Sequence, residues 1–320
     1  MGMKALVTGV AGFAGGHLAR HLLDRGYTVA GIRQPGDRNR TQGSPQLDVE
    51  VREADILDAT SVAKILSDFK PEVIFHLAAF SNPESSWANA RRALETNIIG
   101  SHNVLQAALE TGTRPRVLLV GSVQQYGLVP EGEQPIREDR PQRPLTPYGV
   151  SKSAQEVLGL RFFLAEELPV FLVRSFNHTG PSQESSYVCS SLARQVAEIE
   201  AGRREPTIRV GNLSARRDFS DVRDIVRGYR EILERGKPAD PYNICRGEAF
   251  SIEEILETLR ELSKAKVTVE VDAARYHAVD APLLLGDNTK LCSEVGWKPK
   301  IELKQTLADL LSYWRENLSY

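Results

Sequence analysis

The stretch Lys4-Ala-Leu-Val-Thr8-Gly9-Val-Ala-Gly12-Phe-Ala-Gly15-Gly-His-Leu-Ala-Arg20 decides the fold of this chain. A β-rich run meets an amphipathic helical pattern there, across glycines spaced Gly9-x-x-Gly12-x-x-Gly15. Glycines lack a Cβ, so the backbone can approach a pyrophosphate, and the helix N-terminus offers it free N–H groups and a positive dipole end. We therefore expect a dinucleotide-binding strand–turn–helix, against the alternative of a glycine-rich turn that binds nothing. The expected cofactor contacts are Gly9, Gly12, Phe13, Ala14 and Gly15.

Strand and helix signals alternate over the first two thirds of the chain. The strand-like runs are apolar on both faces, which is typical of a parallel sheet covered by helices on each side. With right-handed crossovers, this predicts a doubly wound parallel α/β sheet of Rossmann type, whose ligands bind at the carboxyl ends of the strands. The expected strands are Ala5–Thr8, Thr28–Ile32, Val49–Glu53, Val73–Leu77, Arg116–Val120 and Val170–Arg174, and the expected helices are Ala14–Arg25, Ser61–Phe69, Arg91–Thr111 and Gly149–Leu168.

The rhythm changes after Arg174, where Gly, Pro, Ser and Asn become frequent from Asn177 to Ser186. Later patterns predict a smaller α/β domain that binds the substrate. We expect residues 1–175 to form the dinucleotide-binding domain, with 214–245 returning to it, and 176–213 and 246–320 to form the second domain. The expected helices are Val188–Ala201, Asp221–Arg235, Ile252–Ser263 and Leu303–Asn317, with short strands near Ile208 and at Val267–Val271.

Composition narrows the classes of function. The 320 residues carry a formal net charge of −2, which gives no reason to expect a nucleic-acid partner. The 3 cysteines lie far apart without a CxxC pair, so a disulfide framework or zinc site is not expected, and the odd count fits a reducing compartment. No stretch approaches the roughly 20 apolar residues of a membrane span, and no cleavable signal segment precedes the first strand. We therefore expect a cytoplasmic protein with no membrane contact and no metal.

The end of the second expected strand bears on the choice of cofactor. An acidic residue usually binds the adenosine 2′-hydroxyl at this point. Here the strand ends Ala30-Gly-Ile-Arg33-Gln34, and an arginine would pair with a 2′-phosphate that a carboxylate would repel. NADP(H) is therefore favoured and NAD(H) stays possible, with Arg38 or Arg40 as helpers. The alternative is that Arg33 is only a solvated surface charge.

A pair of residues of catalytic type follows the fifth expected strand. Tyr148-x-x-x-Lys152 places a phenol and an ammonium on one helix face. A tyrosine can protonate a carbonyl oxygen as hydride arrives at its carbon, and a neighbouring ammonium should lower its pKa toward the working range. Ser122 stands where the preceding strand ends and can polarise the same oxygen. We therefore expect Ser122, Tyr148 and Lys152 to be catalytic, while a strand-end turn role is the alternative for Ser122.

Together these residues resemble the extended short-chain dehydrogenases/reductases that act on nucleotide sugars, over essentially the whole chain. The motifs that carry the resemblance are the initial glycines, Asp55 in Ala-Asp-Ile-Leu-Asp, His76-Leu-Ala-Ala79, Ser122, Tyr148-x-x-x-Lys152 and Arg174-x-x-Asn177-x-x-Gly180-Pro181. The resemblance implies that Asn97 is a structural or proton-relay asparagine beside the cofactor. It also implies cofactor contacts at Asp55 and Ile56 near the adenine and at Leu77, Ala78, Ala79, Tyr148 and Lys152.

Narrower motifs are similar to the GDP-mannose branch of that family: Phe176-Asn-His-Thr-Gly-Pro181, Val210-Gly-Asn-Leu213, Arg217-Asp-Phe-Ser-Asp-Val-Arg-Asp224, Tyr242-Asn-Ile-Cys245 and Gly296-Trp-Lys-Pro299. This resemblance implies reduction at C4 of a GDP-4-keto-6-deoxy-hexose, giving GDP-D-rhamnose, by a homodimer. Arginines suit the diphosphate because their planar fork donates two bonds, although each can instead be an ion-pair residue. The expected substrate contacts are Ser81, Ser122, Gln124, Asn177, Arg194, Asn212, Arg217 and Arg275.

The same resemblance sorts the alternative reactions. Dehydratases of the family carry acid–base groups just after the Ser/Thr, whereas this chain has Val123 and Gln124, which we expect to face the sugar. An NAD-retaining 4-epimerase usually keeps the acidic residue that Arg33 replaces. A non-catalytic dinucleotide-binding scaffold would need no Ser122, Tyr148 and Lys152 set. The stereochemistry at C4 stays open, and GDP-6-deoxy-talose is the alternative product.

Overall fold

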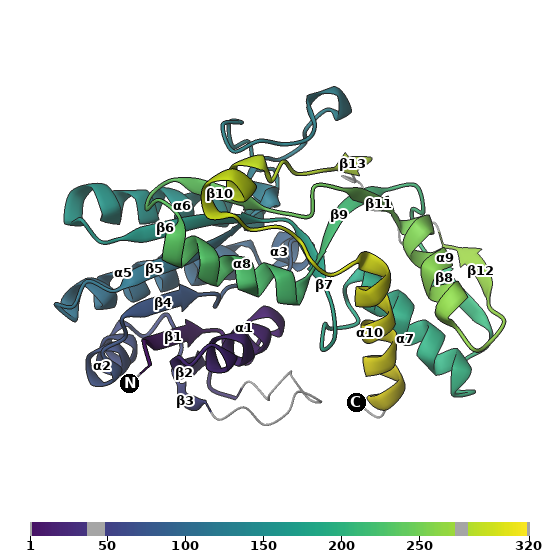
Figure 1. Ribbon diagram of the computed structural model, residues 1–320, viewed down its shortest axis with the longest axis horizontal. Helices are drawn as coiled ribbons and strands as arrows, with labels where there is room; N and C mark the ends of the chain where they lie inside the picture. The colour runs from purple at the N-terminus through teal and green to yellow at the C-terminus, as the bar shows by residue number, and fades with distance from the viewer. Residues whose placement is uncertain (1, 37–48, 273–280, 319–320) are drawn as a thin grey trace.

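The computed structural model describes residues 2–36, 49–272 and 281–318. Its main feature is a seven-stranded sheet in the order β10-β6-β5-β4-β1-β2-β3, shown at the left of Figure 1. Every neighbouring pair of these strands is parallel, which confirms the predicted sheet. The strands are β1 (Lys4–Thr8), β2 (Thr28–Arg33), β3 (Glu50–Glu53), β4 (Val73–His76), β5 (Arg116–Ser122), β6 (Val170–Ser175) and β10 (Pro241–Ile244).

Helices cover both faces of this sheet because the strands are apolar on both faces. One hydrophobic cluster packs α1 (Phe13–Asp24) and α8 (Val222–Arg235) against it. A second cluster packs α2 (Ala59–Phe69), α5 (Gly100–Glu110) and α6 (Pro147–Glu166) on the other face. The strand order reverses at β1, whose neighbours are β2 and β4, so a ligand crevice is expected at the carboxyl ends of these strands.

The predicted helix Arg91–Thr111 is divided in the structure. A short helix α4 (Ala90–Leu94) leads into one π-helical turn, Glu95–Ile99, before α5 begins at Gly100. Single π turns inside helices are frequent at functional sites because they turn a side chain away from the regular helical position. Here the turn contains Asn97. A further short helix, α3 (Ser85–Ala88), precedes it.

The smaller part of the chain lies at the right of Figure 1 and has its own hydrophobic cluster. Its helices are α7 (Val188–Glu200), α9 (Ile252–Leu262) and α10 (Leu303–Glu316). One sheet combines β7 (Asn177–Thr179), β9 (Arg216–Asp221), β11 (Ala249–Ser251) and β13 (Leu283–Leu284). A separate pair joins β8 (Thr207–Val210) with β12 (Thr268–Val271).

The segment 214–245 is divided between the two sheets. Helix α8 and strand β10 belong to the large sheet layer, whereas β9 pairs with β7, β11 and β13. The expected return to the dinucleotide side therefore begins with α8 and not at residue 214. The division of the chain into domains otherwise stays a prediction.

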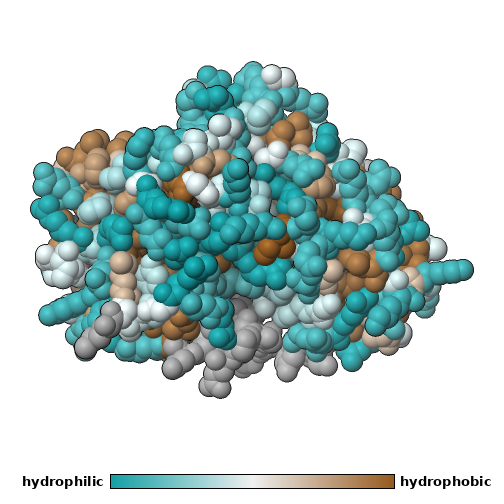
Figure 2. All heavy atoms as spheres, in the orientation of Figure 1, coloured by the Kyte–Doolittle hydropathy of each residue, from teal (hydrophilic) through white to brown (hydrophobic). Residues whose placement is uncertain are grey.

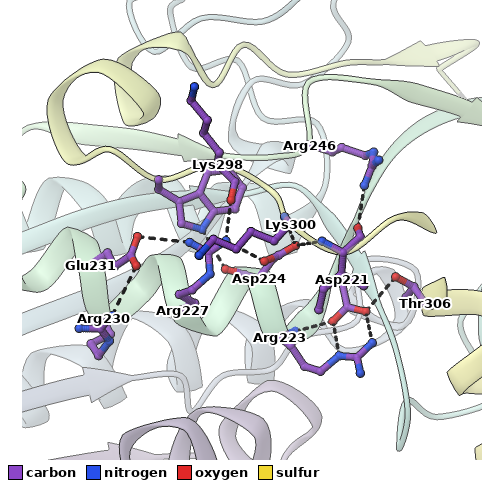
Figure 3. A network of polar contacts seen from close by, with 12 residues as sticks. Asp221, Arg223, Asp224, Arg227, Arg230, Glu231, Arg246, Lys298, Lys300 and Thr306 are labelled. Carbon is purple, nitrogen blue, oxygen red and sulfur yellow. Dashed lines mark hydrogen bonds and ion pairs between the residues drawn. The ribbon is translucent and has the colours of Figure 1, made fainter. Parts of the chain in front are cut away.

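A polar network joins α8 to the chain that precedes α10 (Figure 3). The buried Asp224 carboxylate accepts hydrogen bonds from the backbone N–H groups of Lys300, at 2.7 Å, and Ile301, at 2.8 Å. Arg227 donates to the same carboxylate at 2.7 Å and to the Lys298 carbonyl at 2.6 Å. These contacts fix the crossing segment against the start of α8.

Membrane-spanning helices and clusters of metal-binding side chains are both absent from the described residues. No helix among them is both long and apolar enough to cross a membrane. Within the same ranges, histidines, cysteines, aspartates and glutamates nowhere gather in threes that could hold a metal ion.

Candidate active site

The glycine turn between β1 and α1 forms a cradle for a diphosphate. Gly9 has φ +73°, and a Cβ there would lie 2.8 Å from the backbone nitrogen of Ala78 on the next strand end. A Cβ at Gly15 would lie 2.1 Å from the Gly9 carbonyl oxygen. Gly12 caps α1 without a side-chain hydrogen bond, and the first turn holds no acidic residue. The N–H groups and positive dipole end of α1 are thus left for an anion, so these residues fit a dinucleotide.

Phe13, the first residue of α1, turns its ring toward the smaller part of the chain. It stacks on His178 of β7 with ring centroids 5.9 Å apart, and it meets His17 edge-on at 5.5 Å. His17 also hydrogen-bonds the Pro181 carbonyl at 2.9 Å. Burial lowers the pKa of both histidines, so they favour the neutral form in this contact. The cofactor turn and the segment after β6 are therefore in direct contact.

Arg33 ends β2 and is paired with a carboxylate. Its guanidinium Nη2 lies 2.6 Å from Glu53 Oε1 at the end of β3. Arg33 Nε is buried and has no hydrogen-bond partner among the described residues. The guanidinium thus keeps donor capacity beside the cofactor turn, while Glu53 restrains it. Arg38, Arg40 and Arg275 lie outside the described residues.

The other expected cofactor residues follow the ends of β3 and β4. Asp55 Oδ1 accepts the Leu57 N–H at 2.9 Å, which holds the local turn. Ile56 is buried in the second cluster, and Leu77, Ala78 and Ala79 are half-buried. Ser81 is exposed.

Asn97 is buried, and both the oxygen and the nitrogen of its side-chain amide form hydrogen bonds within the chain. Its Oδ1 accepts the Phe80 N–H at 2.7 Å, and its Nδ2 donates to the Phe80 carbonyl at 3.1 Å. The same nitrogen donates to Ser151 Oγ on α6 at 2.8 Å. These contacts favour the structural interpretation of Asn97 and fix the segment after β4 against α6.

The predicted trio comes together at the carboxyl end of β5. Ser122 is the last residue of β5, and its hydroxyl forms a hydrogen bond with the phenol of Tyr148. Lys152 lies one turn further along α6, with its Nζ 6.0 Å from the centroid of the Tyr148 ring. All three side chains are buried. Because the phenol and the hydroxyl lie next to each other, both can form a hydrogen bond with the same carbonyl oxygen of a substrate.

The expected effect of Lys152 on the phenol is wrong for this structure. Burial raises the pKa of Tyr148 to about 12, although the Ser122 hydrogen bond opposes the rise. Burial also lowers the pKa of Lys152 to about 7. The Lys152 Nζ donates to the Val120 carbonyl at 2.8 Å and to Gln155 Oε1 at 2.9 Å. Tyr148 thus stays protonated at neutral pH, as a proton donor requires.

The two residues after Ser122 point in different directions. Val123 is buried in a fourth hydrophobic cluster with Tyr126 and Phe176, which corrects the expectation that it faces the sugar. Gln124 is half-buried, and its N–H donates to Ser122 Oγ at 3.2 Å. Only Gln124 of this pair therefore keeps a place beside the site.

The expected substrate residues of the smaller part carry contacts within the chain. Arg194 of α7 pairs with Glu198 at 2.8 Å and lies over the Trp314 ring. Arg217 of β9 donates to the Ala281 carbonyl at 2.6 Å. Asn212 accepts the Ser214 N–H at 3.1 Å, and Asn177 is half-buried in β7. A ligand diphosphate would have to share these donors with the chain.

Two residues near Tyr148 escaped the sequence analysis. Ser86 of α3 accepts the Tyr148 N–H at 3.2 Å. Tyr187, which caps α7, acts electrostatically on the Tyr148 phenol and so lies close to it. Both are tens of residues distant in sequence, and no local spacing connects them to the Tyr148 motif.

Comparison with known proteins places this geometry in a family. The family model described as GDP-mannose 4,6 dehydratase matches residues 6–310. GDP-6-deoxy-D-mannose reductase of Pseudomonas aeruginosa is 31% identical over 318 residues, which cover 99% of each chain. GDP-mannose 4,6 dehydratase of Homo sapiens is 28% identical, over 96% of this chain and 90% of the human one.

Solved structures agree with the sequence comparisons. RMD from Pseudomonas aeruginosa complexed with NADPH superposes with a TM-score of 0.87 at 31% identity, covering 98% of this chain and 99% of that one. The UDP-glucose 4-epimerase of Thermus thermophilus in complex with NAD gives 0.86 at 28% identity, covering 98% of this chain and all of that one. The resemblance predicted from the motifs is thereby confirmed. The chain belongs to the GDP-mannose 4,6 dehydratase family of extended short-chain dehydrogenases/reductases.

Proposed function

We propose that this oxidoreductase reduces the C4 keto group of a GDP-4-keto-6-deoxy-hexose to give GDP-D-rhamnose, with NADPH preferred over NADH. The observation that carries the proposal is the buried Ser122, Tyr148 and Lys152 set at the carboxyl end of β5. The similarity to a GDP-6-deoxy-D-mannose reductase over the whole chain supports the substrate class. The glycine cradle and the similarity to an NADPH complex support the cofactor.

Each residue has a defined part in this reaction. NADPH, when bound, supplies the hydride to C4. Tyr148 donates its phenolic proton to the C4 oxygen, because burial keeps this phenol protonated at neutral pH. The Ser122 hydroxyl hydrogen-bonds the same oxygen and holds it beside the phenol. We assign Asn177, Arg194, Asn212, Arg217 and Arg275 to the nucleotide sugar, and Ser81 and Gln124 to the hexose side.

The direct test supplies GDP-4-keto-6-deoxy-mannose and NADPH and follows absorbance at the nicotinamide wavelength. Stoichiometric oxidation of NADPH is expected, and NMR of the product sugar then distinguishes the rhamno from the talo configuration at C4. NADPH that stays reduced with every 4-keto sugar nucleotide would contradict the proposal.

Dehydration of GDP-mannose is the second reaction to test because dehydratases are among the relatives. Water loss needs a base at C5 and an acid at the C6 hydroxyl. Gln124 exchanges no proton near neutral pH, and Val123 is buried in the fourth cluster. We expect no 4-keto-6-deoxy product from GDP-mannose with catalytic NADP. Steady formation of that product would identify the chain as a dehydratase.

Arg33→Ala is expected to weaken NADPH binding about ten- to a hundredfold and NADH binding much less. Only NADPH carries the 2′-phosphate that the guanidinium would contact. The measurement is titration of both cofactors by fluorescence. Arg52→Ala is the matched control, because Arg52 is 25% exposed against 26% for Arg33 and also pairs with a glutamate. An equal loss of affinity for NADPH and NADH would show that Arg33 does not bind the 2′-phosphate.

We also propose that two copies of this chain associate through α6. Apolar side chains form an exposed stripe along this helix at Val150, Val157 and Leu164, with Leu160 beside them. Leu164 is 69% exposed, and Figure 2 shows hydrophobic residues gathered at the end of the molecule that α6 occupies in Figure 1. An apolar stripe of this spacing is typical of a helix that packs on another helix.

Val157→Glu combined with Leu164→Glu is expected to convert the dimer into monomers, because four charges would be buried in the interface. Light scattering after gel filtration measures the mass. Val271→Glu on β12 is the control, since Val271 is also exposed but lies far from α6 in the fold. A parent protein that is monomeric, or a double variant that stays dimeric, would contradict the assignment.

A further inference from the structure

A series of buried polar side chains, joined by hydrogen bonds, extends from Lys152, and none of these side chains was assigned a role above. Gln155 Oε1 accepts from Lys152 Nζ at 2.9 Å, and Gln155 Nε2 donates to Ser101 Oγ at 2.8 Å. Ser101 Oγ also lies 2.9 Å from His76 Nε2, and His76 Nδ1 lies 2.8 Å from Thr8 Oγ1. This series of hydrogen bonds thus extends from Lys152 to Thr8 at the end of β1, next to the glycine turn.

The donors of this series can be assigned by counting protons. The Ser101 hydroxyl has one proton, which it donates to the Asn97 carbonyl at 2.6 Å. It must therefore accept from both Gln155 Nε2 and His76 Nε2. Thr8 in turn accepts the Ala78 N–H at 3.1 Å and donates to His76 Nδ1. His76 is neutral with its proton on Nε2, in keeping with burial, which lowers its pKa to about 3.

This assignment fixes which end of the Gln155 amide faces the lysine. Ser101 has no proton left to donate, so the amide nitrogen must point to Ser101 and the amide oxygen to Lys152. The Lys152 ammonium has three protons. Val120 O and Gln155 Oε1 accept two of them, so one proton remains beyond these two contacts. A reversed amide would place two donors against each other in a buried region, at a large energetic cost.

We propose that Gln155 is a positioning residue that orients the Lys152 ammonium and stabilises its charged form, held in this orientation by Ser101 and His76. The proposal rests on the proposed function for the catalytic role of Lys152 only, because the effect on the ammonium itself is a property of the free protein. A carbonyl oxygen at 2.9 Å favours the charged amine against the surrounding apolar burial.

The test titrates Lys152 directly in the cofactor-free protein. The chain is labelled with 13C at the ε carbon of lysine, and the Lys152 signal is identified by its loss in Lys152→Arg. Gln155→Met removes the acceptor at similar volume and should lower the pKa of Lys152 by about one unit. Gln155→Glu places a carboxylate there and should raise the pKa by about one unit or more. Ser101→Ala frees the amide to reverse and should act in the direction of Gln155→Met.

The other titratable groups near Lys152 do not change charge in the pH range of this titration. The pKa of His76 is lowered to about 3 and that of Tyr148 is raised to about 12, so neither changes charge between about pH 5 and 10. Glu156, on the next turn of α6, is paired with Arg174 at 2.6 Å. Gln195→Met is the matched control, because Gln195 is a buried amide of α7 that bonds the backbone of Arg209.

Shifts of opposite sign for Gln155→Met and Gln155→Glu, with none for Gln195→Met, would support the proposal. Lys152 titrating within about 0.3 unit of the parent in both variants would overturn it. The high-pH limb of turnover should follow the same order, because activity falls as Lys152 loses its proton. If the NMR titrations shift but this limb does not, the positioning by Gln155 stands, and the catalytic role of Lys152 is wrong.

Discussion

Tyr148→Phe is expected to lower turnover about 100-fold or more, up to about 10⁴-fold, while cofactor affinity stays nearly unchanged. The phenol donates the proton that neutralises the developing C4 alkoxide in the proposed reaction, and Phe keeps the ring and its packing. Ser122 would still hold the oxygen, which is why some activity should remain. Turnover with NADPH and the 4-keto substrate, together with a separate cofactor titration, measures both quantities.

Tyr242→Phe is the matched control for this variant. Tyr242 is also a buried tyrosine, and its phenol donates to Glu294 at 2.8 Å, but it lies on the edge strand β10. Its loss should leave turnover within about threefold of the parent, because it makes no contact with the reacting group. A Tyr148→Phe protein as active as Tyr242→Phe would remove Tyr148 from the mechanism.

Asp224→Ala is expected to lower the free energy of unfolding by about 3–5 kcal/mol. This carboxylate accepts two backbone N–H groups and the Arg227 guanidinium, and its side chain is only 3% exposed. Alanine would leave the two backbone N–H groups without an acceptor, and Arg227 would keep only its longer ion pair with Glu231, at 3.4 Å. Urea unfolding followed by circular dichroism gives the change through the shift of the midpoint.

Asp309→Ala provides the comparison within the same region. Asp309 pairs with Arg223 at 2.7 Å, but its side chain is 28% exposed and Arg223 keeps Asp221 as a partner. Its loss should cost no more than about 1 kcal/mol. Equal destabilisation by the two alanine variants would show that burial of Asp224 does not set its energetic role.

Local spacing explains what the sequence predicted well. The glycine turn and the Tyr148-x-x-x-Lys152 pair are each contained in a few residues, and the backbone geometry of one turn fixes how their members lie. The parallel sheet followed from apolar runs that need no knowledge of distant partners. The predicted fold is confirmed, and the structure brings Ser122 next to Tyr148, while the catalytic roles of the trio stay a prediction.

Other features depend on contacts that sequence spacing does not contain. Arg33 meets Glu53 only because β2 pairs with β3 in a register that sets the two side by side. The pKa of Tyr148 rises because the folded chain buries the phenol. The Lys152 ammonium, which was expected to lower this pKa, donates to the Val120 carbonyl and to Gln155. Strand β9 reads as polar, Arg216-Arg-Asp-Phe-Ser-Asp221, so pattern analysis missed it and the sheet that it joins.

The position of α8 and β10 has a consequence for how the chain is made. Val222, Ile225 and Tyr229 of α8 pack in one cluster with Val7 and Leu118 of the sheet and with Tyr242 of its edge strand β10. Trp297, later still, completes the same cluster. A nascent chain that has left the ribosome as far as β6 therefore has six of the seven strands and α1, but not α8, β10 and Trp297, which complete this face. The large sheet layer is therefore complete only when most of the protein has been synthesised, and until then its apolar strands are exposed to chaperones and to aggregation.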